Sequence, residues 1–101
     1  MSDPKNKEFF TQVKQQKESL IKDFPLYQFA VSQVMESLLN WYRGVSKLVG
    51  EEVSLEGFDA LCAQRLFIHE ASRSLPMKVQ FRTEGLAKPV DDMFIEFTEE
   101  D

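Results

Sequence analysis

The stretch from Leu26 to Val49 constrains the fold most strongly. Apolar side chains recur there at alternating steps of four and three residues, which is the spacing of a heptad seam on one face of a helix. A second apolar stripe lies beside the seam, and only Glu36, Arg43 and Lys47 carry charge. A helix that is apolar over so wide an arc must be covered, either by its own domain or by another chain. The seam residues are Tyr27, Val31, Val34, Leu38, Trp41, Val45 and Leu48.

The length and the cysteine content limit the class of protein. We expect residues 1–101 to form a single domain, large enough to fold without a disulfide or a metal. The single cysteine, Cys62, excludes a disulfide within the chain and fits a reducing compartment. Residues 1–7 are polar and charged, unlike a signal peptide, and the apolar helix is too polar to span a bilayer. We therefore expect a cytoplasmic protein that does not act at a membrane.

The net charge of −5 is unevenly distributed. Residues 1–50 carry seven basic and five acidic side chains, whereas residues 51–101 carry five basic and twelve acidic ones. This excess of acid disfavours non-specific binding to nucleic acid, and it permits a partner with a basic surface.

Helical spacing and end signals predict three helices, over residues 4–23, 25–49 and 54–75. Pro25 disfavours helical geometry in the residue before it, so the first helix ends there and the second begins. Ser54 is a good N-cap for the third helix, since its hydroxyl can accept a backbone N–H from the first turn.

After the third helix the apolar pattern changes to alternation, which is typical of half-buried strands. We predict strands over residues 77–83 and 92–98, joined by a loop. An antiparallel register would place Arg82 opposite Asp92, where the opposite charges attract. The predicted fold class is therefore α+β, with three N-terminal helices, the second long and central, followed by a C-terminal antiparallel β-hairpin.

The side chains with chemical potential do not form a recognisable site. His69 follows Cys62 by seven residues, so two helical turns, about 10 Å, separate them, too far for one metal ion or for a nucleophile–base pair. We expect a buried thiol and a half-exposed imidazole. Asp91 and Asp92 would point to opposite faces of a strand, and pairing of Asp92 with Arg82 is the favoured interpretation.

The sequence therefore predicts no catalytic residue, no cofactor and no metal site. Glycines are scattered and match neither dinucleotide-binding nor phosphate-loop spacing. A small hydrolase or metal protein is the least favoured alternative, because His69 or Asp92 would have to supply its chemistry. No small-molecule substrate is evident.

The favoured hypothesis is a small acidic, non-enzymatic protein-binding module, acting as an adaptor, inhibitor, regulator or chaperone-like protein. Its partner would be another protein or a second copy of itself, with self-association through the second helix as one mode. Tryptophan and tyrosine are common interface anchors. The predicted partner-binding residues lie together on the second helix: Leu38, Trp41, Tyr42 and Val45.

An alternative is a winged-helix-like regulator that binds nucleic acid, because three helices followed by a hairpin is the order of elements in that fold. The third helix would then read the major groove. It offers Arg65 and Arg73 as cations, and the wing would offer Arg82 and Lys88, but acidic residues outnumber them in both segments. Phosphate binding needs several uncompensated cations, so nucleic acid is a disfavoured partner.

Overall fold

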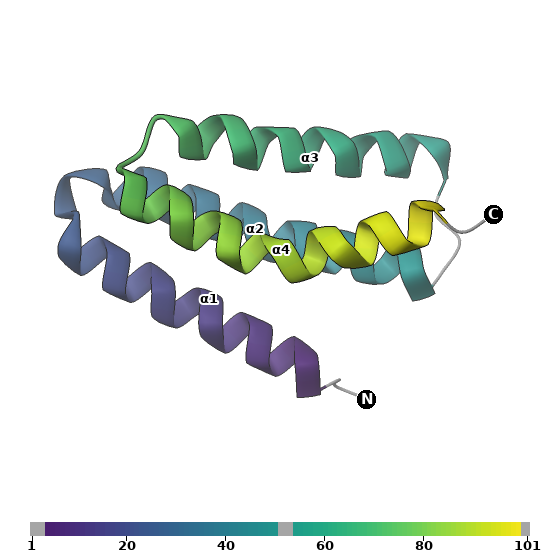
Figure 1. The fold of residues 1–101 in the computed structure, drawn as a ribbon, viewed down its shortest axis with the longest axis horizontal. Coiled ribbons are helices and arrows are strands. Elements are labelled where there is room, and N and C mark those ends of the chain that lie inside the picture. Colours follow the sequence, from purple (N-terminus) through teal and green to yellow (C-terminus); the bar gives the residue numbers. More distant parts are fainter. Residues whose placement is uncertain (1–3, 51–53, 100–101) are drawn as a thin grey trace.

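The structure is a computed structural model that describes residues 4–50 and 54–99, and over these residues the chain is helical (Figure 1). Successive helices run in opposite directions, so the bundle has an up-down-up-down order (Figure 1). The elements are α1 (Pro4–Asp23), the 3-10 turn η1 (Pro25–Tyr27), α2 (Gln28–Gly50), α3 (Leu55–Arg73) and α4 (Met77–Glu99).

The three helices expected in the first three-quarters of the chain are present. α1 has the predicted bounds, and the segment after Pro25 makes one 3-10 turn before α2 begins at Gln28. Ser54 caps α3 as predicted, since its Oγ accepts a hydrogen bond of 3.1 Å from the Gly57 N–H. Local signals thus mark both ends of α1 and the start of α3, whereas α2 begins at Gln28 and α3 ends at Arg73.

The predicted β-hairpin is wrong, and with it the α+β fold class. Residues 77–83 and 92–98 lie in the single helix α4, together with the segment expected to be a loop. The alternation in both short windows also fits a longer stripe with a period of about 3.6 residues. That stripe faces the core and consists of Val79, Thr83, Leu86, Ala87, Val90 and Phe94.

One proline, Pro76, precedes α4, and a second, Pro89, lies inside it while the helix continues. The Pro76 carbonyl accepts hydrogen bonds from the N–H groups of Val79 (2.9 Å) and Gln80 (3.1 Å), which starts the helix. Pro89 lies inside the helix and has no N–H to donate to the Gly85 carbonyl. Gly85 is exposed, so water can solvate that carbonyl.

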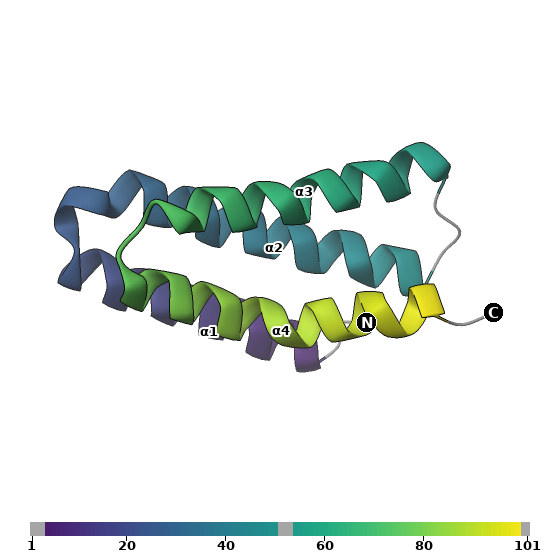
Figure 2. The ribbon, with the colours of Figure 1, turned by 45° about the horizontal axis from the view of Figure 1, so that its top comes forward.

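The bundle is flattened, with extents of 43 × 29 × 18 Å. α2 and α4 pack directly against each other, and α1 and α3 lie on opposite sides of this pair (Figure 1). α3 runs alongside α2, as the turned view in Figure 2 also shows, and among the described residues α1 and α3 make no contact. One hydrophobic core takes side chains from all four helices.

The core-facing side of α4 holds mostly small side chains. Its fully buried positions at the centre hold small residues, Val79, Thr83, Ala87 and Val90, against the larger Leu38 and other side chains of α2. Because the distance between packed helices depends on the side chains at their contact, small residues here favour a close approach of α4 to α2. Gly44 lets α3 lie close to α2, because a methyl group of Leu61 occupies the space where a Cβ on residue 44 would lie.

The Thr83 hydroxyl is buried in this interface without a hydrogen-bond partner among the described residues. We expect Thr83→Val to stabilise the protein by about 1 kcal/mol, since valine has the same shape and buries no polar group. Urea unfolding at constant m-value measures the change. The matched control is Thr98→Val on the exposed end of the same helix, expected to stay within about 0.5 kcal/mol. A destabilised Thr83→Val protein would contradict the expectation.

An ion pair joins the end of α1 to the start of α4. The Lys78 Nζ donates a 2.6 Å hydrogen bond to Asp23 Oδ2, and this bond and the lysine charge lower the pKa of the Asp23 carboxyl below its ordinary value. The pair therefore contributes stability above the unfolded-state pKa of Asp23, and the contribution is lost as the pH falls through the lower folded-state pKa.

Carboxyl NMR titration measures this pKa directly. We expect the pKa of Asp23 to lie below its ordinary value in the wild-type protein, and to rise towards that value in Lys78→Gln. Lys88→Gln, a charge change elsewhere on α4, should leave the pKa of Asp23 unchanged. An unshifted Asp23 in the wild-type protein would mean that the pair does not persist in solution.

Candidate functional site

The residues predicted to bind a partner lie in the core of the monomer. Leu38, Trp41 and Val45 are at most 1% exposed, and Tyr42 is 8% exposed. Tyr42 stacks on Phe9 of α1 with ring centroids 4.5 Å apart. The apolar seam of α2 from Val31 to Leu48 is therefore covered within its own chain, although Trp41 and Tyr42 still line hollows at the surface.

A groove with a volume of about 480 Å³ lies instead between α3 and α4, and Trp41 is one of its lining residues. Its walls come from two helices that pack only lightly against each other, and α2 supplies the tryptophan at its floor. The lining residues are Trp41, Cys62, Arg65, Leu66, His69, Asp91, Phe94 and Ile95.

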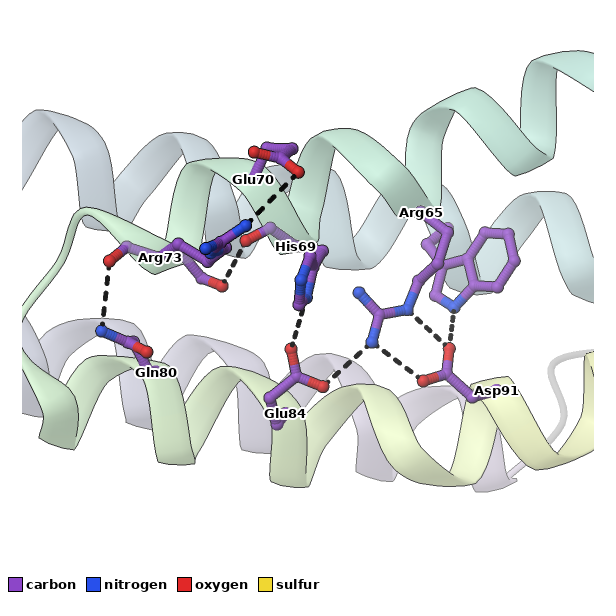
Figure 3. Close-up of polar contacts among 9 residues, drawn as sticks. Arg65, His69, Glu70, Arg73, Gln80, Glu84 and Asp91 are labelled. Carbon is purple, nitrogen blue, oxygen red and sulfur yellow. Dashed lines mark hydrogen bonds and ion pairs between the residues drawn. The ribbon is translucent and has the colours of Figure 1, made fainter.

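The polar part of the groove is centred on Asp91. Its Oδ1 accepts hydrogen bonds from Trp41 Nε1 (3.0 Å) and Arg65 Nε (2.9 Å), and its Oδ2 accepts one from Arg65 Nη2 (3.0 Å) (Figure 3). The arginine contact is bidentate, the strongest geometry for such a pair. One carboxylate thus connects α2, α3 and α4.

Glu84 extends the network along α4. Arg65 Nη2 donates to Glu84 Oε2 at 3.0 Å, and His69 Nδ1 lies 3.8 Å from Glu84 Oε1 (Figure 3). Burial lowers the pKa of Arg65, but hydrogen bonds and charges from Asp91 and Glu84 outweigh it, so the pKa is raised overall. The guanidinium therefore stays charged and is held by two carboxylates, while its Nη1 is buried without a partner among the described residues.

The apolar rim of the groove is exposed. Leu66 on α3 is 60% exposed and Ile95 on α4 is 47% exposed. Leu55 lies about three turns before Leu66 and on the same face of α3, and Met77 lies about five turns before Ile95 on the same face of α4. Both are more than two-thirds exposed, as is Phe81, one turn after Met77. The exposed apolar surface therefore extends beyond both ends of the groove.

Two expectations about single side chains need correction. Cys62 is exposed at the groove, not buried. The pairing of Arg82 with Asp92 is absent, because in a helix these residues do not face each other; Arg82 donates to Gln16 Oε1 at 3.3 Å, and Asp92 is exposed.

The described residues bear on two other classes of site. Within residues 4–50 and 54–99, no group of three or more histidine, cysteine, aspartate or glutamate side chains could hold a metal ion. In the same part of the chain, no helix is long and apolar enough to cross a membrane. The winged-helix alternative loses its structural basis, since α4 replaces the hairpin that would form the wing.

Sequence reasoning missed Arg65, Glu84 and Asp91 as a cluster. Glu84 and Asp91 are seven residues apart and so share a face of a helix. The predicted hairpin hides this relation, because it places both residues in the loop between its strands. Once α4 is treated as a helix, that spacing presents both carboxylates to Arg65 on α3.

Comparison with family models, with curated protein sequences and with solved structures found no match to this chain.

The network around Asp91 should contribute measurably to stability. Asp91→Asn removes the charge that pairs with Arg65 and turns one accepting atom into a donor facing N–H groups. We expect a loss of about 2 kcal/mol in the free energy of unfolding, at the modest end for charged hydrogen bonds because the site is partly exposed. Asp92→Asn, the neighbouring exposed carboxylate, is the control and should cost less than about 0.5 kcal/mol. Equal effects of the two substitutions would rule out the bridging role of Asp91.

Proposed function

We propose that the protein is a non-enzymatic protein-binding module that holds an amphipathic helix of a partner protein in the groove between α3 and α4. The observation that carries the proposal is a set of exposed apolar side chains on α3 and α4, of which Leu66 and Ile95 line the groove and the others lie beyond its ends. These side chains are Leu55, Leu66, Met77, Phe81 and Ile95.

The form of this surface favours a helix over a small molecule. A small ligand could fill the 480 Å³ groove, but it would not cover Leu55 at one end or Met77 at the other. A helix laid along α3 and α4 reaches both ends, because its residues at positions i, i+3, i+4 and i+7 form a continuous apolar stripe. The occupant would be the fifth helix of the bundle.

The hydrogen-bonded network of Arg65, Asp91 and Glu84, called the polar floor below, holds the walls of the groove in fixed positions. Arg65 is held by Asp91 and Glu84, and Asp91 is held in turn by the buried Trp41. The groove walls are therefore positioned before a partner arrives, which reduces the entropy lost on binding.

The earlier hypothesis of self-association through the second helix has less support, because α2 uses its apolar seam in the core. A second copy remains an outcome of the test below. We place the protein in the cytoplasm, which the single exposed thiol of Cys62 supports, since free thiols persist in a reducing compartment.

The test uses a helical peptide of about 20 residues with a leucine stripe and uncharged glutamine flanks. We expect it to bind with a Kd tighter than about 100 µM, and to shift the amide NMR signals of Leu66, Ile95 and their neighbours. Leu66→Asp or Ile95→Asp should weaken binding at least about tenfold, by placing a charge against the apolar stripe.

Phe67→Asp is the matched control, because Phe67 is also on α3 and is 42% exposed but does not line the groove. It should bind the peptide as the wild-type chain does. Shifts confined to another surface, or no binding, would overturn the proposal. Sedimentation of the free protein at micromolar concentration should give a monomer, and a dimer dispersed by Leu66→Asp would identify a second copy as the occupant instead.

A further inference from the structure

The polar floor of the groove carries an excess of negative charge. Arg65 provides one positive charge, whereas Asp91 and Glu84, which both hydrogen-bond to it, provide two negative ones. The arginine is therefore already neutralised within its own chain. A partner with a carboxylate above this floor would face the uncompensated charge.

Two further carboxylates, called the rim carboxylates below, are exposed on the helices that flank the groove, although neither is among its lining residues. Asp59 precedes Cys62 by three residues on α3, and Asp92 precedes Ile95 by three residues on α4, so each shares a face with a lining residue. Both are exposed, and neither makes an ion pair with a described residue. Lys88 lies four residues from both Glu84 and Asp92 on α4, so it supplies one cation against these acidic groups.

We infer that the helix that binds this groove carries lysine or arginine residues along both sides of its apolar stripe. The inference rests on the proposed function and adds the charge of the partner. Apolar side chains between α3 and α4 supply the contact area, and cations on the flanks of the helix reach Asp59 on one side and Asp92 on the other.

The physical expectation is electrostatic complementarity. Opposite charges facing across an interface favour the right partner and repel a like-charged one, and rim charges act mainly on the rate of association. The attraction falls with salt, because the Debye length is about 8 Å at 0.15 M ionic strength. Binding of a basic helix should therefore weaken as salt is added, unlike binding of the uncharged peptide.

The experiment compares three helical peptides with the same leucine stripe and with lysine, glutamine or glutamate flanks. At low salt we expect the lysine peptide to bind about tenfold more tightly than the glutamate peptide, which corresponds to about two or three rim ion pairs. Isothermal titration calorimetry measures each Kd, and the NMR shifts verify that all three peptides occupy the groove.

A double variant tests the residues that the inference names. Asp59→Asn with Asp92→Asn should reduce the preference for the lysine peptide from about tenfold to about twofold, while the affinity for the glutamine peptide stays unchanged. The matched control is Glu18→Gln with Glu36→Gln, which removes the same charge from exposed positions on α1 and α2. This control should keep the full preference.

The outcomes separate the inference from the function on which it rests. If the three peptides bind the groove equally, or the glutamate peptide binds best, the basic partner is overturned and the helix-binding function stands. If none of them binds, the proposed function fails as well. If both double variants reduce the preference equally, it reflects the overall charge of the protein, and the assignment to Asp59 and Asp92 is overturned.

Discussion

The direct packing of α2 on α4 is the constraint on which the rest of the structure depends. Small side chains such as Ala87 and Val90 let α4 approach the apolar face of α2, and that contact lies along the thin dimension of the bundle. α1 and α3 are then placed on opposite sides of the pair. α3 packs mainly on α2, so its edge facing α4 lacks a full set of apolar contacts. The groove is therefore a consequence of how the core is filled.

Polar bonds accompany the apolar contact between α3 and α4, where Phe58 stacks on Phe94 with ring centroids 5.4 Å apart. The carboxylate of Asp91 joins Arg65 of α3 to Trp41 of α2, and Glu84 extends the same network. Directed bonds of this kind fix the separation of two helices without filling the space between them. Apolar side chains above them, among them Leu66 and Ile95, consequently stay exposed and available to another chain.

A helix of this bundle is predictable from the sequence where its end signals and its hydrophobic periodicity are strong. α1, α2 and α3 have marked ends at residues such as Pro25 and Ser54, and their helical nature was predictable. α4 was not, because its core stripe includes Thr83 and Ala87, which give a weak hydrophobic signal, and because Pro89 suggested a loop. The groove was out of reach for the same reason, since one of its walls had been assigned to strands. Trp41 is predicted from the sequence to bind a partner; in the structure its indole lines the groove and donates a hydrogen bond to Asp91.

Substitutions at the floor and at the rim of the groove would cost the fold different amounts of stability. Substituting Asp91 or Arg65 disturbs a partly buried network and the indole of Trp41 together, so selection for stability alone is enough to preserve them. The side chains of rim residues such as Asp59 and Asp92 are exposed and make no hydrogen bond or ion pair with a described residue. They can be substituted with little cost to folding, so related proteins could differ in the partners that they bind at the rim while they keep the same four-helix fold.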